Sequence, residues 1–191
     1  MRPISWLHVS DIHMNVRDAW SQDVVLAAMC RRIEKLREDG LAADFILATG
    51  DLAFSGKAAE YALARDFFEA LFKASGVPKE RIFCVPGNHD IDRSRQTLCF
   101  KGARSSLDSQ QLVDEVLAPD DDLATLLERE QGYRRFQNGY FNNQERTPTT
   151  DGLAYISRLE IDGIDIAAFV LDFRAEGVEP RTFALRISHA D

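Results

Sequence analysis

The sequence predicts an α/β protein, with an α+β sandwich character in its second half. Over the first 90 residues, three short apolar runs alternate with two segments of helical periodicity, the pattern of a parallel β-α-β-α-β unit. Later in the chain, two β-rich runs flank an Asp-Gly pair, which is typical of an antiparallel hairpin. Together these observations indicate a sandwich-like core with helices outside it.

The predicted parallel unit contains three strands and two helices. Each strand run is almost continuously apolar, as expected for a parallel sheet that is covered on both faces. In each helical segment the apolar side chains return to one face, and a glycine follows the last of them. Right-handed crossovers would place the carboxyl ends of all three strands at one edge. We expect strands at 4–9, 44–48 and 81–85, and helices at 21–38 and 57–74.

The second half of the chain is expected to be helical first and β-rich afterwards. We expect residues 91–150 to form a helical cap or insertion within a single domain that spans 1–191. The stretch "YRRFQNGYFNNQ" could line a substrate pocket, or its aromatic residues Tyr133, Phe136 and Tyr140 could pack inward from an amphipathic helix. The expected elements are helices at 108–117 and 120–140, strands at 153–161 and 164–173, and a further strand in "TFALRIS", 182–188.

The composition is that of an ordinary soluble globular protein, with 45% apolar and 28% charged residues. A net charge of −8 argues against bulk attraction to a nucleic acid backbone. No apolar run reaches the roughly 18 residues of a membrane span, and the N-terminus has no signal-peptide pattern. We therefore expect a cytoplasmic protein without membrane contact. Three widely spaced cysteines predict thiols rather than a disulfide framework or a structural zinc site.

Polar side chains follow each of the three predicted parallel strands. They are Asp11 and His13 after the first strand, Asp51 after the second, and Asn88, His89 and Asp90 after the third. Because ligands of open α/β sheets bind at the carboxyl ends of strands, we expect these three loops to converge. Carboxylates brought together repel one another unless a cation lies between them. Mixed oxygen and nitrogen ligands without thiolates suit Mn, Fe, Zn or Ni, so the sequence predicts a transition-metal site.

The stretches "SDIH", "TGDLAFSG" and "VPGNHDIDR" resemble the calcineurin-like metallophosphoesterase superfamily. They are most similar to its bacterial branch, which includes cyclic-nucleotide phosphodiesterase-like members. The resemblance covers roughly residues 4 to 95. It implies a four-layer α/β/β/α sandwich that holds two divalent metal ions. It also implies a phosphoesterase that hydrolyses a small phosphomonoester or phosphodiester through a hydroxide held between the two ions.

The resemblance implies a set of metal ligands. Asp11 and His13 would bind the first metal, Asp51 would bridge both metals, and Asn88 would bind the second. The family supplies further histidines, including a "GHxH" loop, but this sequence has four histidines in all and no such loop. His189 could replace one missing ligand, or it could be a residue of a frayed tail.

The resemblance also implies a catalytic pair. His89 would face the phosphate and protonate or stabilise the leaving oxygen, and Asp90 would orient His89. Among the residues beyond the motif, Arg93, Arg95 and Tyr140 could contact the phosphate or the substrate, or they could form a solvated surface.

The incomplete set of histidines leaves two functions open. One is an active phosphoesterase, and the other is a degenerate, non-catalytic module that binds a metal or a phosphate in an assembly or regulatory role. The family's later helix and strands have no counterpart in "RAEGVEPRTFALR", so we expect an exposed sheet edge. We therefore also expect a homo-oligomer in which another subunit covers that edge.

Overall fold

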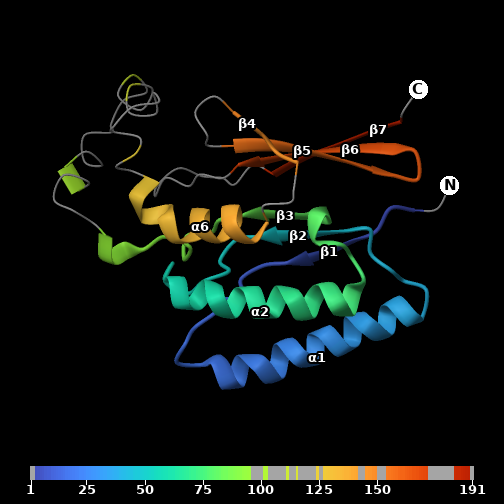
Figure 1. Cartoon of the computed structure of the whole chain (residues 1–191), viewed down its shortest axis with the longest axis horizontal. Coiled ribbons are helices and arrows are strands. Elements are labelled where there is room, and N and C mark those ends of the chain that lie inside the picture. The colour runs from blue at the N-terminus through green and yellow to red at the C-terminus, as the bar shows by residue number, and fades with distance from the viewer. Residues whose placement is uncertain are drawn as a thin grey trace.

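The computed structural model describes residues 3–95, 101–102, 111, 115, 124, 127–141, 145–149, 154–171 and 183–189. These residues form three layers (Figure 1): helices, a three-stranded parallel sheet and a four-stranded antiparallel sheet. The predicted α/β architecture with both kinds of sheet is confirmed. A fourth, outer layer of helices is not among the described elements.

The parallel sheet has the strand order β1-β2-β3, and each crossover is a helix. Its elements agree closely with the predicted ranges. Helix α2 begins where the Glu60 carboxylate accepts hydrogen bonds from the amides of Ser55 and Lys57, and it ends at Gly76 in the left-handed conformation. The elements are β1 (Trp6–Val9), α1 (Ala19–Glu38), β2 (Phe45–Thr49), α2 (Ala58–Ser75) and β3 (Ile82–Val85), with the 3-10 turn η1 (Lys79–Arg81) before β3.

The antiparallel sheet has the strand order β4-β5-β6-β7. The Asp-Gly hairpin is confirmed: Asp162 and Gly163 have φ values of 52° and 78°, as a type I′ turn requires. The strand predicted in "TFALRIS" is also present, whereas β4 was not predicted because two residues carry no periodicity. The strands are β4 (Thr147–Pro148), β5 (Ala154–Ile161), β6 (Ile164–Leu171) and β7 (Phe183–His189).

The segment 91–150 is described in part. Its elements are the 3-10 turns η2 (Arg93–Arg95) and η3 (Glu128–Glu130) and the helix α6 (Gln131–Tyr140), which is the C-terminal part of the predicted helix 120–140. Most of the predicted helix 108–117 lies outside the described residues, and a cap formed by 91–150 stays a prediction. The inward packing of Tyr133, Phe136 and Tyr140 is confirmed, because all three are buried against α2.

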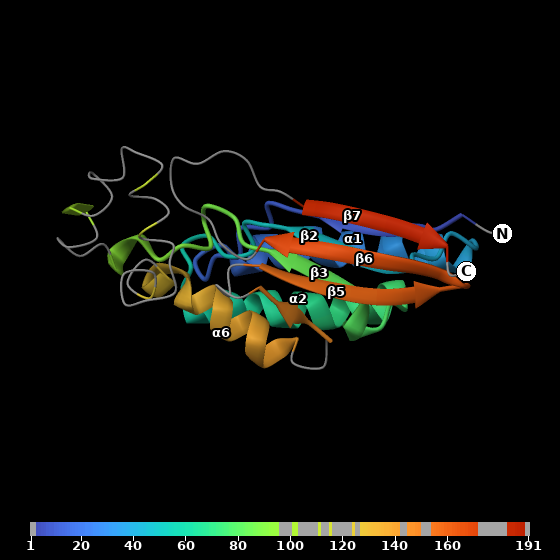
Figure 2. The same cartoon turned by 90° about the horizontal axis from the view of Figure 1, so that it is seen from above.

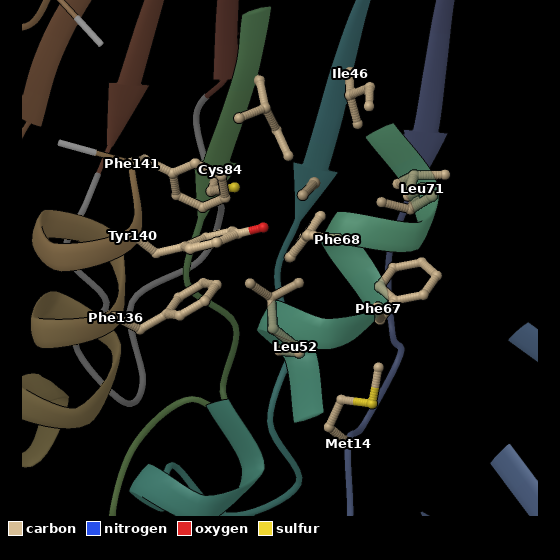
Figure 3. Packing of buried hydrophobic residues seen from close by; sticks show 14 of the residues in the cluster. Met14, Ile46, Leu52, Phe67, Phe68, Leu71, Cys84, Phe136, Tyr140 and Phe141 are labelled. Atoms are coloured by element: carbon tan, nitrogen blue, oxygen red, sulfur yellow. The ribbon is translucent and has the colours of Figure 1, made fainter. Parts of the chain in front are cut away.

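Two apolar cores hold the layers together. One core lies between the parallel sheet and the helices, where Phe136, Tyr140 and Phe141 face Phe68 and Leu52 (Figure 3). The other lies between the two sheets, and Figure 2 shows the antiparallel strands lying over the parallel ones. No helix of the described chain combines the length and the apolar character needed to cross a membrane. The site described next lies at the carboxyl ends of β1, β2 and β3.

Candidate metal centre at the ends of the parallel strands

The loops after β1 and β2 stay paired beyond the ends of their strands. The amide of Asp11 donates to the carbonyl of Gly50 (3.1 Å), and the amide of His13 donates to the carbonyl of Asp51 (2.8 Å). These bonds extend the parallel pairing of β1 and β2 by several residues. They therefore set the separation of the two loops that carry the first three polar side chains of the predicted site.

Three residues of these loops have an unusual backbone conformation. Asp11, His13 and Asp51 have φ values of 55°, 50° and 55°, in the left-handed region that residues other than glycine seldom occupy. Each such residue costs on the order of 1–2 kcal/mol, so the surrounding contacts have to impose the conformation. All three are among the five metal ligands predicted from the sequence, which points to a functional use of the strain.

The loop after β3 packs directly against Asp51. A β-carbon added to Gly87 would lie 1.9 Å from Oδ1 of Asp51, so only glycine fits at this position. The next loop residue but one, His89, donates its amide to the same Oδ1 (2.9 Å). Asp51 is only 3% exposed, and its carboxylate therefore lies where all three loops meet.

The Asp90 carboxylate ties the third loop back to the second. It is fully buried and accepts hydrogen bonds from the amides of Leu52, Ala53 and Gly87 at 3.2, 2.9 and 2.8 Å, and from the Tyr61 hydroxyl at 3.0 Å. Burial raises the pKa of the Asp90 carboxyl above its usual value, against the lowering effect of these hydrogen bonds. Asp90 therefore holds the backbone of the loop that carries His89, and none of these hydrogen bonds goes to the His89 ring.

The imidazole of His89 is oriented by a backbone carbonyl instead. Its Nδ1 lies 2.8 Å from the carbonyl oxygen of Phe54, and since a carbonyl can only accept, Nδ1 carries a proton. The other ring nitrogen, Nε2, is left for the site. The His89 ring packs edge-on against the ring of His13 with 4.5 Å between centroids, and the Phe54 ring lies beside both. The sequence contained no signal for the role of Phe54.

Asp11, His13 and Asp51 form a group that could hold a metal ion. One ligand atom of each residue lies within 4.8 Å of the others. The Asp11 side chain is 59% exposed, whereas Asp51 is buried, so the group joins the interior to the surface. Nδ1 of His13 is buried and has no hydrogen-bond partner among the described residues. Two carboxylates and an imidazole at this spacing suit a divalent cation.

A pocket of about 280 Å³ opens beside this group. His13 and His89 line it together with Phe54 and residues of the first helix and the loop before it, Asn15, Asp18 and Gln22. The Gln22 side-chain amide donates to the carbonyl of His13 (2.9 Å), so helix α1 also helps to hold the strained first loop. Sequence reasoning missed Gln22, because a polar residue on an exposed helix face has no distinguishing pattern.

The remaining predicted ligands lie in different places. Asn88 is half-buried between Gly87 and His89, so its backbone lies beside Asp51. Of the three predicted substrate contacts, Arg93 and Arg95 belong to η2 and are exposed, whereas Tyr140 is buried in α6.

His189 lies away from the metal centre, contrary to the prediction that it could supply a ligand there. It pairs with Ile164 beside the β5–β6 turn. The residue of the antiparallel sheet that lies near the end of β3 is Tyr155, whose hydroxyl donates to the carbonyl of Cys84 (3.5 Å). Tyr155 and the β5–β6 turn are separated by most of the length of β5, about 20 Å at 3.3 Å per residue. In Figure 1, β7 runs opposite to β1 and so ends far from the convergent loops.

Comparison with known proteins agrees with this geometry. A family model described as "Calcineurin-like phosphoesterase" matches residues 4–168, most of the chain. The chain is 29% identical over 114 residues to "Uncharacterized metallophosphoesterase-like protein YydB" of Bacillus subtilis (strain 168). That similarity covers 59% of this chain and 23% of the relative, so the chain spans less than a quarter of the relative's length. On the strength of the family match, the chain belongs to the calcineurin-like phosphoesterases.

Proposed function

We propose that this protein is a metal-dependent phosphoesterase that hydrolyses a small phosphomonoester or phosphodiester. The observation that supports it is the meeting of Asp11, His13 and Asp51 within 4.8 Å, with the ring of His89 against that of His13. Membership of the family supports the same chemistry. The similarity of "VPGNHDIDR" to the cyclic-nucleotide phosphodiesterase-like branch favours a small ester over a polymer, and so does the net charge of −8.

In this proposal the three loops hold two divalent metal ions from the group Mn, Fe, Zn and Ni. Asp11, His13 and Asp51 hold the first ion, and Asp51 and Asn88 hold the second. When bound, such ions neutralise charge on the phosphoryl oxygens and lower the pKa of a water molecule. The buried position of Asp51 suits a shared ligand, because every loop of the site contacts it.

The chain's own contribution is to position His89 and to move one proton. The Phe54 carbonyl accepts the Nδ1 proton and fixes the ring, which leaves Nε2 for the site. In the doubly protonated imidazolium form, Nε2 would give its proton to the leaving oxygen, and the ring would return to the neutral form with Nδ1 protonated. The amide of His89 is bonded to Asp51, and this places the imidazole next to the metal ligands. Asp90 acts indirectly: it holds the backbone of this loop through hydrogen bonds, and it is therefore a positioning residue.

The test compares Asp51→Asn with Asp162→Asn, a matched control with the same left-handed φ in the β5–β6 turn. Nitrophenyl phosphate and bis(nitrophenyl) phosphate are the substrates, with added Mn²⁺. We expect the wild type and Asp162→Asn to hydrolyse at least one ester. The rate of Asp51→Asn with that ester should be at least about a thousandfold lower. Absence of chelator-sensitive hydrolysis of any ester by the wild type would refute the proposal.

The position of His189 favours one alternative function. Because His189 pairs with Ile164 beside the β5–β6 turn, the described residues provide only Asp51 and Asn88 for the second ion. A non-catalytic module that binds one metal or one phosphate, with an assembly or regulatory role, would keep the first site alone. Elemental analysis separates the two proposals: two ions per chain support hydrolysis, and a single ion without turnover supports the module.

We also propose that the protein forms a homo-oligomer through its sheet edges. β1 and β7 are outer strands of the sheets formed by the described residues, and Trp6 on β1 is 51% exposed. An exposed strand edge with a large apolar side chain favours association with another chain. Sedimentation velocity at micromolar concentration tests this proposal, and a single monomeric species would contradict it.

A further inference from the structure

A second hollow lies between α2 and α6 and shares no lining residue with the pocket at the metal centre. Its volume is about 490 Å³, within the range of pockets that hold small organic ligands. It is built from the loops after β2 and β3, the first turns of α2 and one face of α6. We refer to it as the α2–α6 groove. Neither the family assignment nor the proposed reaction uses it.

Small residues create the groove. At one end Gly132 of α6 touches the loop after β2, since an added β-carbon would lie 2.4 Å from the carbonyl oxygen of Gly56. Ala58 and Ala62 on α2 and Gly139 on α6 then line the space between the helices. The close contact at Gly132 holds the helices together, and the short side chains leave room along the rest of the face.

The groove is cationic in a chain whose net charge is −8. Among the residues that the structure describes, four basic side chains line it, Lys57, Arg65, Arg95 and Arg135, against a single carboxylate, that of Asp92. Basic side chains gathered in a concave site raise the local concentration of anions. Guanidinium groups also donate two parallel hydrogen bonds to a pair of phosphate or carboxylate oxygens.

Two of the four cations are already engaged within the loop. Lys57 Nζ lies 2.6 Å from Oδ1 of Asp92, and Arg95 Nε lies 3.5 Å from its other oxygen. Arg135 is exposed, and its guanidinium forms no hydrogen bond or ion pair with any residue that the structure describes. Among the described residues, the guanidinium of Arg65 has only a long contact with Asp66, 3.9 Å between Nε and Oδ1. Arg65 and Arg135 thus keep their donors for a ligand.

We propose that the α2–α6 groove binds a phosphorylated organic anion independently of the metal centre. A phosphomonoester or a diphosphate carries the two or more negative charges that the surplus of basic groups would neutralise. The groove is larger than a bare phosphate requires, and Ala62 and Phe136 give it apolar wall for an organic portion. The ligand class is therefore a small molecule with a phosphate or diphosphate at one end and an apolar or aromatic body.

The groove and the metal centre are connected through shared loops. Phe54 lines the metal pocket and Gly56 lines the groove, and both belong to the loop after β2. In the same way Asp90 holds the metal loops, while Asp92 lies in the groove. An added β-carbon on Gly56 would lie within 3 Å of the backbone of residues 90 to 92, so the two loops are in direct backbone contact. Binding in the groove would stiffen the loops of the metal centre.

The test measures binding to the chelator-treated protein, so that no metal can hold a phosphate. Adenosine diphosphate, pyrophosphate and adenosine are titrated by isothermal calorimetry. We expect adenosine diphosphate and pyrophosphate to bind and adenosine to bind much more weakly. Arg135→Gln should weaken adenosine diphosphate binding about tenfold, the effect of losing one charged hydrogen bond. The matched control Arg31→Gln, on the exposed face of α1, should leave it unchanged.

A second pair of variants tests the shape of the groove. Ala62→Leu adds bulk to an exposed helical position in the groove and keeps every charge, whereas Ala28→Leu makes the same change on α1. We expect Ala62→Leu to weaken the binding of adenosine diphosphate more than the binding of pyrophosphate. Ala28→Leu should change the affinity for neither. The proposal is overturned if neither anion binds the metal-free protein, or if Arg31→Gln and Arg135→Gln weaken binding equally. Asp51→Asn should abolish ester hydrolysis yet leave this binding intact, so failure of one proposal is distinguishable from failure of the other.

Discussion

Asp51 and Asp162 have nearly the same backbone conformation, with φ values of 55° and 52°, but they occur in opposite settings. Asp162 is an exposed residue of a two-residue hairpin turn and is followed by Gly163. Asp51 is 3% exposed and lies where three loops meet. The same backbone conformation thus occurs at Asp162 in a turn that requires it and at Asp51 in the centre of the candidate site.

The two settings differ in what holds the conformation. At Asp162 the turn itself is responsible, because a type I′ turn matches the twist of the two strands that it joins. At Asp51 the contacts are tertiary: its carbonyl accepts from His13, and its carboxylate accepts from His89. Local sequence is therefore sufficient for the first residue, whereas the second depends on segments distant in the chain. Four substitutions sharpen this comparison.

The largest effect is expected from Gly87→Ala compared with Gly163→Ala. At Gly87 the new methyl group would overlap both the carboxylate and the amide of Asp51, so we expect a loss of at least about 3 kcal/mol in the free energy of unfolding. At Gly163 the space is open and only the left-handed φ is unfavourable, which costs about 1–2 kcal/mol. Urea denaturation measures both, and equal losses would show that the loops adapt around residue 87.

Asp90→Asn removes the tie between the second and third loops. The asparagine amide would direct N–H groups at backbone donors, so we expect a loss of about 2–3 kcal/mol in stability. Relief of the buried charge, whose cost raises the pKa of Asp90, offsets part of this loss. The matched control is Asp165→Asn at an exposed position of β6, which should change stability little. Metal affinity should fall in Asp90→Asn alone, and unchanged affinity would argue against its positioning role.

Asp92→Asn tests the ion pair between Asp92 and Lys57, which lies beside the loops around Asp51. Burial raises the pKa of the Asp92 carboxyl, but hydrogen bonds from Lys57 and Ser94 outweigh it and leave the pKa below the usual value. A lowered pKa stabilises the fold above the unfolded-state pKa, about 4, and this contribution is lost as pH falls through the lower folded-state pKa. The variant should be about 1 kcal/mol less stable than the wild type at pH 6.

That difference should shrink as the pH falls below about 4, because the unfolded chain then binds a proton at Asp92 while the folded carboxylate is still ionised, and it should disappear below the lowered folded-state pKa. Urea titrations at pH 6, 4 and 3 measure it, with Asp23→Asn on the exposed part of α1 as the control. A difference that persists at the lowest pH would assign the effect to packing rather than to charge.

The smallest effect is expected from Asp162→Asn. Asparagine tolerates the left-handed region and is favoured in type I′ turns, so stability should stay within about 0.5 kcal/mol of the wild type. Thermal unfolding measures this directly. A clear loss of stability would mean that the turn depends on tertiary contacts, as Asp51 does, and the contrast between the two aspartates would disappear.

Local patterns were sufficient for most of the fold. The apolar runs of β2 and β3, the periodicity of α1 and α2 and the Asp-Gly turn were all readable, because each depends on neighbours in the chain. The convergence of Asp11, His13 and Asp51 was also predictable, since parallel strands with helical crossovers present their carboxyl ends at one edge. The contacts of Asp90 with Leu52 and Ala53, and of Phe54 with His89, were not predictable, because each joins residues that are 35 or more positions apart.

The sequence by itself therefore determined most of the elements, the parallel arrangement of the first three strands and the identity of the polar groups at their ends. Only the tertiary structure decided that Asp90 holds the backbone of the second loop, that Phe54 orients His89, and that His189 lies near Ile164 at the far side of the sandwich. It also placed Arg65 and Arg135 on two walls of one groove. Periodicity and turn chemistry act over a few residues, whereas these contacts depend on strand register and on glycines that let distant backbones touch.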